Sequence, residues 1–293
     1  MYKSIRIIPK LDIKGPNLVK GIQLEGLRVL GKPEQFARYY YETGADELIY
    51  MDVVASLYNR SSLHVIIKKT AKEIFIPLTV GGGLRTIEDI RNVLIAGADK
   101  VSLNTAAIKN PAIIKEISRE FGSSTIVISI EAIKQPNGVY LAYTDNGREY
   151  TGIEVLQWAK KVEELGAGEI LLTSIDREGR GKGYDIELTK MVVNAVSIPV
   201  IAFGGAGKLE HLKEVVEEGN ADAVAIASML HYDFIRNNTD ILDISLDCKE
   251  GNMEFLMNKE NFPNIYTSNL LEIKNFLIRN GIDCRSPKKS YHD

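Results

Sequence analysis

Residues 44–48 read GADEL, and 122 residues further along the chain residues 166–170 read GAGEI. Two more pairs keep nearly the same spacing: IPLTVGGG at 76–83 with IPVIAFGG at 198–205, and IIPKLDIK at 7–14 with VISIEAIK at 127–134. Self-similarity at a fixed period indicates repeated copies of one structural unit. The sequence therefore predicts a fold made of two similar halves.

Each half alternates short runs of β-branched residues with amphipathic stretches, which is typical of βα units and a parallel sheet. The predicted strands cover residues 5–11, 47–52, 78–80, 100–103, 126–131, 169–173, 200–203 and 223–226. Helical stretches follow the strands, for example at 33–43, 86–96, 152–165 and 209–218. Four βα units in each half predict an α/β fold, a closed (β/α)8 TIM barrel built from two half-barrels. An open, doubly wound sheet is the competing arrangement.

A polar stretch interrupts this pattern before the last helix. Residues 232–267 are rich in Asn, Asp, Glu and Lys and show little periodicity, which predicts an insertion or accessory element. A final helix is expected at 270–280, with Ser268 as its N-cap and Gly281 as its C-terminal stop. We therefore assign residues 1–231 and 268–285 to a single barrel and residues 286–293 to a frayed tail.

The composition is that of a soluble globular protein with room for one large core. Of the 293 residues 45% are hydrophobic and 26% are charged, and the net charge of −3 argues against a chain that coats nucleic acid. No apolar run approaches the ~18 residues needed to cross a membrane, and the charged N-terminus does not resemble a signal peptide. We expect a cytoplasmic protein that binds neither nucleic acid nor membrane.

Cysteine and histidine are too scattered for a metal centre. Cys248 and Cys284 lie apart near the C-terminus, and the four histidines stand alone along the chain. We expect no metal ion and no cofactor.

Two acidic residues occupy matching positions in the two halves. Asp12 ends the first predicted strand and Glu131 ends the fifth. Active sites of TIM barrels lie at the C-terminal ends of the strands, so both carboxyl groups are expected to face one cavity. There they can divide general-acid and general-base work if their environments separate their pKa values. The alternative is that each is an ordinary solvated acid at a strand end.

Glycine-rich turns follow the strands at matching places in both halves. Small residues let backbone N–H groups approach an anion closely, and neighbouring hydroxyl or amide groups can add hydrogen bonds. The residues with this chemistry are Gly82, Gly83, Asn104 and Thr105 in the first half and Gly204, Gly205 and Ser228 in the second. A single glycine cluster is usually a plain turn, but two clusters in register predict a small-molecule substrate with a phosphate at each end.

Several motifs point to one family. They are KLD at 10–12, LVKG at 18–21, TVGGG at 79–83, ADKVSLNTAA at 98–107, GAGEILLTSID at 166–176, GYD at 183–185 and GGAGK at 204–208. With these motifs the chain resembles the cyclase subunit of imidazole glycerol phosphate synthase, an enzyme of histidine biosynthesis. The likeness runs from about residue 4 to residue 231 and returns more weakly at 268–285.

The resemblance implies a reaction and a set of site residues. In that family a glutaminase partner, docked at the barrel floor as a heterodimer, supplies ammonia. The ammonia reacts with a bis-phosphorylated formimino ribulosyl aminoimidazole carboxamide nucleotide to give imidazole glycerol phosphate and aminoimidazole carboxamide ribonucleotide. The resemblance makes Asp12 the principal acid/base and places Lys20 on a flexible first loop over the substrate. It assigns substrate or phosphate contacts to Gly82, Gly83, Asn104, Thr105, Asp176, Gly179, Gly204, Gly205 and Ser228.

The resemblance also implies an ammonia entrance made of charged residues at the barrel floor. The matching residues are Arg6, Glu47, Lys100 and Glu169, whose two positive and two negative charges can neutralise one another. Asp99, beside Lys100, matches a position that pairs with the glutaminase. The alternative is a salt-bridge layer that only stabilises the floor.

The chain departs from the family pattern close to the chemistry. Glu131 stands where the family has an aspartate, and the extra methylene moves the carboxylate by roughly 1 Å, which can reduce the rate on the order of 100-fold. Phe203 replaces a small polar residue, and Glu178 replaces an aspartate. These changes leave a second hypothesis open: a paralogue from a surface-polysaccharide (lipopolysaccharide) gene cluster, which passes ammonia to a sugar amidotransferase that forms acetamidino groups.

Overall fold

The computed structural model describes residues 4–55, 63–238 and 264–286. Eight parallel strands form its centre: β1 (Arg6–Lys14), β4 (Leu48–Asp52), β5 (Leu78–Gly81), β6 (Lys100–Leu103), β7 (Ile126–Lys134), β10 (Glu169–Ser174), β11 (Val200–Phe203) and β12 (Ala223–Ile226). Each strand pairs with the next in this order, and β12 pairs with β1, so the sheet closes on itself. The predicted (β/α)8 barrel is confirmed, and the open sheet is excluded.

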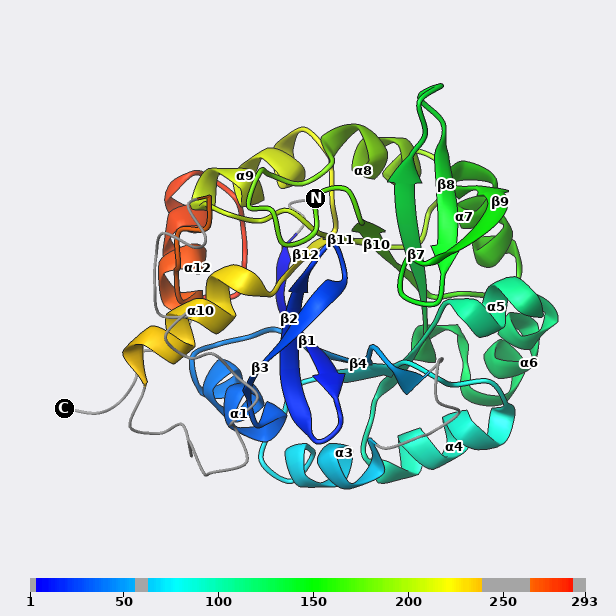
Figure 1. Cartoon of the computed structure of the whole chain (residues 1–293), viewed down its shortest axis with the longest axis horizontal. Helices are drawn as coiled ribbons and strands as arrows, with labels where there is room; N and C mark the ends of the chain where they lie inside the picture. The colour runs from blue at the N-terminus through cyan, green and yellow to red at the C-terminus, as the bar shows by residue number, and fades with distance from the viewer. Residues whose placement is uncertain (1–3, 56–62, 239–263, 287–293) are drawn as a thin grey trace.

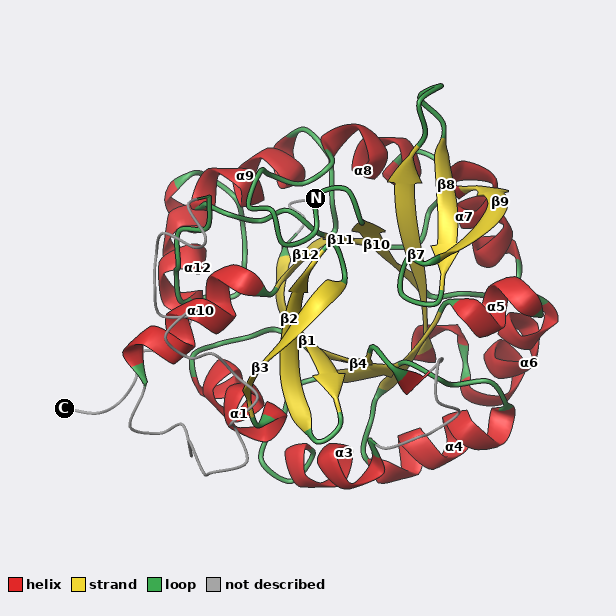
Figure 2. Cartoon of the chain, in the orientation of Figure 1, coloured by secondary structure: helices red, strands yellow, loops and turns green. Residues whose placement is uncertain are grey.

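Helices surround this barrel on the outside, as Figures 1 and 2 show. They are α1 (Pro33–Glu42), α3 (His64–Thr70), α4 (Ile87–Ala96), α5 (Thr105–Lys109), α6 (Ala112–Phe121), α7 (Val155–Glu164), α8 (Ile186–Val193), α9 (Leu209–Glu217), α10 (Ser228–Asn237) and α12 (Leu270–Arg279), with a short 3₁₀ turn at Ser123–Thr125. Among the described residues, no helix is both long enough and apolar enough to span a bilayer.

Two antiparallel hairpins extend the barrel where the sequence predicted none. The first consists of β2 (Asn17–Ile22) and β3 (Glu25–Gly31), which continue β1, and the second of β8 (Tyr140–Thr144) and β9 (Glu149–Glu154), which continue β7. Consequently Asp12 and Glu131 lie inside their strands and not at the ends, and the helix expected at 152–165 begins only at Val155. The hairpins occupy equivalent places in the two halves, which extends the repeat.

The core has two layers. Ile7 and Leu11 of β1 belong to the large cluster between the sheet and the helices, whereas Ile8 belongs to a smaller cluster inside the barrel. The members of this inner cluster are Ile8, Ile49, Val127, Leu171, Ile201, Phe203, Ala223, Ala225 and Ala227. Because side chains alternate along a strand, Arg6 and Lys10 share the inner side of β1 with Ile8.

The last helix is capped differently from the prediction. Asn269, not Ser268, is the N-cap, because its side chain accepts from the Glu272 N–H while the Glu272 side chain accepts from the Asn269 N–H. Ser268 is buried, and its N–H points to the Met229 carbonyl. Gly281 follows the helix with a positive φ of 81°, as expected of a C-terminal stop.

The predicted insertion is described only at its ends. Its first residues, up to Asn237, belong to α10, and residues 264–267 lead into α12. Residues 239–263, with Cys248, and residues 287–293 of the predicted tail lie outside the described residues. The domain boundaries therefore stay a prediction.

Candidate active site at the barrel mouth

Asp12 lies inside the mouth of the barrel and is buried, with 3% of its surface exposed. It stands two residues beyond Lys10 on β1, so both side chains point to the same side of the strand. The Lys10 ammonium group contacts the Asp12 carboxylate and lies 4.5 Å from the ring centroid of Phe203. Asp12 is thus an acid with a fixed cationic partner.

Glu131 comes from β7 and has a different environment. Its carboxylate accepts a hydrogen bond from the Gly147 N–H at 2.8 Å. Burial raises the pKa of Glu131 to about 7, and the negative charge of Asp12 also raises it, although Gly147, Lys10 and Asn104 act in the opposite direction. The two predicted acids therefore face the same mouth in unlike environments, Asp12 beside a cation and Glu131 buried against a backbone N–H, which is an arrangement suited to acid–base work.

A cavity of about 530 Å³ opens beside Glu131. The residues predicted to hold the first phosphate lie along it: Gly82, Gly83, Asn104 and Thr105. A Cβ atom at Gly82 would approach the Asp52 carbonyl to 2.2 Å, and φ there is +97°, so the position requires glycine. Two buried polar atoms in this wall, Ser102 Oγ and Asn104 Oδ1, have no hydrogen-bond partner among the described residues. The first predicted phosphate site is assembled and open.

The second predicted phosphate site is assembled but closed. Gly179, Gly204, Gly205 and Ser228 surround a space of only about 10 Å³, together with Phe203 and Lys20. Lys20 is 3% exposed and lies in β2, which corrects its predicted place on a flexible loop. Its ammonium group contacts Glu178 and donates to the Gly21 carbonyl at 2.7 Å, while Glu178 also accepts from the Leu24 N–H at 3.0 Å. This buried ion pair joins β2 to the loop that follows β10.

Asp176 is not part of either site. Its carboxylate accepts from the Lys134 N–H at 2.9 Å, and it lines a separate hollow with Tyr140 and Asp185. The structure therefore brings together the predicted glycines, amide and hydroxyls, whereas Asp176 lines neither of these two spaces and its contact with substrate stays a prediction.

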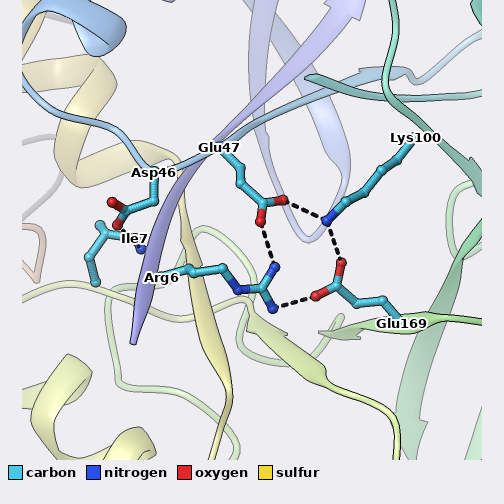
Figure 3. Close-up of polar contacts among 6 residues, drawn as sticks. All are labelled: Arg6, Ile7, Asp46, Glu47, Lys100 and Glu169. Atoms are coloured by element: carbon cyan, nitrogen blue, oxygen red, sulfur yellow. Dashed lines mark hydrogen bonds and ion pairs between the residues drawn. The ribbon is translucent and has the colours of Figure 1, made fainter. Parts of the chain in front are cut away.

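The four predicted floor residues form a closed ring (Figure 3). Arg6 donates to Glu47 at 2.7 Å and contacts Glu169, while Lys100 lies 3.0 Å from Glu47 and 3.2 Å from Glu169. Burial alone would lower the pKa of Arg6, but the two carboxylates raise it above its ordinary value. All four charges are paired, and the ring closes the floor of the barrel.

Asp99 is exposed beside this ring. One of its oxygens accepts from the Leu78 N–H at 2.8 Å, and it borders a shallow hollow with Phe75, whose side chain is 80% exposed. Asp46 and Asp222 make the same bond to Ile7 and Val200, each at 2.8 Å. Asp99 thus accepts the hydrogen bond of the first backbone N–H of β5. Its predicted contact with a glutaminase stays a prediction.

Sequence reasoning missed the roles of Lys10, Ser102 and His231. His231 is fully buried: its ring nitrogens pair with the Tyr40 hydroxyl at 2.7 Å and the Lys10 carbonyl at 3.0 Å. Burial lowers the pKa of His231 to about 3, so it is neutral. Of these three residues, only Lys10 could have been found from the sequence. Its two-residue spacing from Asp12 places both side chains on one side of a strand.

A closed barrel with two unlike carboxyl groups and a polar cavity at its C-terminal mouth defines an enzyme of the TIM-barrel class. The family model described as "Histidine biosynthesis protein" matches residues 6–236. The chain therefore belongs to this family, within it to the cyclase subunits of imidazole glycerol phosphate synthase, as its relatives indicate.

Three relatives carry the name imidazole glycerol phosphate synthase subunit HisF. That of Legionella pneumophila is 60% identical over 207 residues, which cover 71% of this chain and 98% of the relative. That of Alkaliphilus metalliredigens is 49% identical over 227 residues, covering 78% and 90%. That of Methanococcus vannielii is 46% identical over 268 residues, covering 85% and 97%. These names favour the cyclase hypothesis and do not favour the ammonia-conduit alternative.

Proposed function

We propose that this chain is the cyclase subunit of an imidazole glycerol phosphate synthase. It uses ammonia to convert the bis-phosphorylated formimino ribulosyl aminoimidazole carboxamide nucleotide into imidazole glycerol phosphate and aminoimidazole carboxamide ribonucleotide, a cytoplasmic step of histidine biosynthesis. The observation that carries the proposal is the pair of carboxyl groups, Asp12 and Glu131, that face one mouth in unlike environments.

The acid pair can move protons in both directions at neutral pH. Asp12, held beside the Lys10 ammonium group, is suited to accept a proton. Glu131, whose pKa burial raises to about 7, is partly protonated near pH 7 and is suited to donate one. A cyclisation with loss of a leaving nucleotide needs both steps.

The two glycine-lined sites would bind the two phosphates of the substrate. In the first half the cavity is open, and the Ser102 hydroxyl, which has no hydrogen-bond partner among the described residues, lies in its wall and can donate to a phosphate. In the second half a phosphate would compete with Glu178 for the Lys20 ammonium group, since phosphate forms charge-assisted hydrogen bonds as a carboxylate does. Binding would thus free Lys20 from its partner and open the second site.

Ammonia would enter through the floor. β1 runs from Arg6 in the ring to Asp12 at the mouth. Between them lies the inner cluster, whose members are apolar and include the small residues Ala223 and Ala225. Such a lining admits neutral ammonia far more readily than ammonium, because burying an unpaired charge is costly. A glutaminase subunit docked on the floor near Asp99 would supply it, and one pair of the ring would have to open for passage.

The proposal is tested with the purified chain, ammonium salt at alkaline pH and the bis-phosphorylated substrate, so that free ammonia replaces the glutaminase. We expect turnover by the wild type and at least a 100-fold lower rate in Asp12→Asn. Glu187→Gln, which removes an exposed carboxylate outside the mouth cavity, is the matched control and should keep the full rate. A folded wild type that activates a glutaminase but gives no turnover would refute the proposal and favour ammonia transfer to a sugar amidotransferase.

A further inference from the structure

Lys10 is a charged group beside the predicted base Asp12, and its own role has not yet been described. Its side chain is enclosed, with 4% of its surface exposed. It occupies the inner side of β1 between Ile8, in the apolar inner cluster, and Asp12 at the mouth. A lysine in this place is therefore surrounded by the barrel wall and not by solvent.

A buried ammonium group costs several kcal/mol unless partners compensate it. Here two partners do so: the Asp12 carboxylate in direct contact, and the face of the Phe203 ring at 4.5 Å. The same contact restrains Asp12, because a carboxylate that accepts from a fixed ammonium group has little rotational freedom. Lys10 thus restrains the orientation of Asp12, the residue proposed as the base, and places a positive charge beside its carboxylate.

Within the described residues, four titratable groups face Asp12 from the elements packed around it. They are Lys10 on β1, Lys20 on β2, Glu131 on β7 and His231 on α10. Lys20 is in contact with Glu178, and both ring nitrogens of His231 are paired. Among these four, Lys10 is the one whose side chain contacts the Asp12 carboxylate.

We propose that Lys10 is a positioning residue: its ammonium group holds the Asp12 carboxylate in one orientation toward the cavity, where Asp12 acts as the base and Glu131 as the acid. The inference rests on the proposed cyclase function and specifies how its two carboxyl groups divide the work. Lys10 needs no contact with substrate for this role.

The role has a signature in the pH dependence. The positive charge of Lys10 is one of the causes that lower the pKa of Glu131. Loss of this charge should therefore move the alkaline limb, set by Glu131, to higher pH. A residue that only fills space would lower the rate equally at every pH.

The test compares Lys10→Met, which keeps the length without the charge, with Lys10→Arg, which keeps the charge. Ammonium-dependent rates are divided by the free-ammonia concentration at each pH. For Lys10→Met we expect kcat at pH 7 to fall roughly 10- to 100-fold, KM for the bis-phosphorylated substrate to change little, and the alkaline limb to rise by about one pH unit. Lys10→Arg should keep the wild-type limbs, and Lys161→Met, at an exposed lysine of α7, should behave as wild type.

The outcomes separate the two proposals. An inactive wild type overturns the proposed function and this inference with it. An active wild type together with an unshifted alkaline limb in folded Lys10→Met overturns the inference alone, whether the rate falls or not. If Lys10→Met does not fold, Lys10→Gln, which keeps a polar group beside Asp12, supplies the neutral variant, and its alkaline limb decides in the same way.

Discussion

Glu131 reaches from β7 to the backbone of the β8–β9 hairpin, where the Gly147 N–H donates to it at 2.8 Å. Gly147, Asn104 and the charge of Lys10 together do not offset its burial, and so the pKa of Glu131 rises to about 7. The longer side chain that sets this chain apart from the aspartate of the family pattern thus has a defined backbone partner. Its proton affinity links the chemistry at the mouth to the stability of the fold.

This link gives a prediction on stability. In the unfolded chain the carboxyl group ionises near its ordinary pKa of 4.5, whereas in the folded chain it ionises near 7, so the ionised form destabilises the fold above pH 7. Glu131→Gln should therefore be more stable than wild type at pH 8, and the difference should vanish as the pH falls below 4.5. The full shift corresponds to at most ~3 kcal/mol, and partial solvent contact reduces this to about 1–2 kcal/mol.

Urea unfolding between pH 4 and pH 9 measures this difference. Glu164→Gln, at an exposed carboxylate of α7, is the control and should show a small difference that does not depend on pH. Parallel stability curves for wild type and Glu131→Gln would contradict the raised pKa.

At the level of single residues, the sequence predicted Asp12 and Glu131 as the acids of the site, because the C-terminal ends of the strands form the active site of a TIM barrel. It could not predict the state of Lys20, because the buried contact with Glu178 joins segments 158 residues apart. Nor could the sequence predict the surroundings of Lys10, because its contact with Phe203 joins β1 to β11 and depends on the closure of the barrel.

Among the elements, the starts of β1, β4, β6 and β10 supply the ring of Arg6, Glu47, Lys100 and Glu169. Both glutamates are nearly enclosed, so removal of one cation leaves two buried carboxylates with a single partner. Lys100→Met should therefore reduce the free energy of unfolding by about 2–3 kcal/mol. Arg91→Met, which breaks the exposed pairs of Arg91 with Glu88 and Glu120, should cost less than about 1 kcal/mol.

Both values follow from urea unfolding at neutral pH. An equal, small effect of the two substitutions would show that the ring is no more than a solvated surface network, and would remove it as a candidate gate.

The start of α12 allows a second prediction at this scale. Asn269 and Glu272 form a reciprocal capping box, whereas Ser268 precedes it and is not the cap. Asn269→Ala should therefore destabilise the protein by about 1 kcal/mol, and Ser268→Ala should cost less. Thermal unfolding of the two variants compares them directly, and a larger loss in Ser268→Ala would restore the sequence prediction.

The sequence predicted elements well where hydrophobic periodicity decides and poorly where turn conformation decides. All eight barrel strands lie where they were expected, to within a few residues. The β2–β3 hairpin escaped notice because its turn uses Gln23 and Leu24 with φ of 52° and 65°, residues that rarely adopt this conformation. Asp145 and Asn146 at the second turn are better suited, yet they follow strands too short to be recognised alone.

In the whole molecule the two halves share the arrangement of their strands and glycine-rich turns, but the site in the first half is open and the site in the second half is closed. The repeat predicted the closure of the barrel and both glycine-lined sites. It did not predict that one site encloses about 530 Å³ and the other about 10 Å³, since this difference arises from Lys20 and Glu178, which close only the second. A repeat in sequence fixes the positions of backbone elements, whereas side-chain packing decides which site is open.

In the proposed enzyme, ammonia crosses the barrel from the charged floor to the acids at the mouth. The most direct measurement uses the chain in complex with a glutaminase subunit, glutamine labelled with ¹⁵N at its amide, the bis-phosphorylated substrate and excess unlabelled ammonium in solution. We predict that the imidazole product carries the glutamine label almost undiluted. A product labelled only in proportion to the bulk nitrogen, or no product from an intact complex, would contradict the claim.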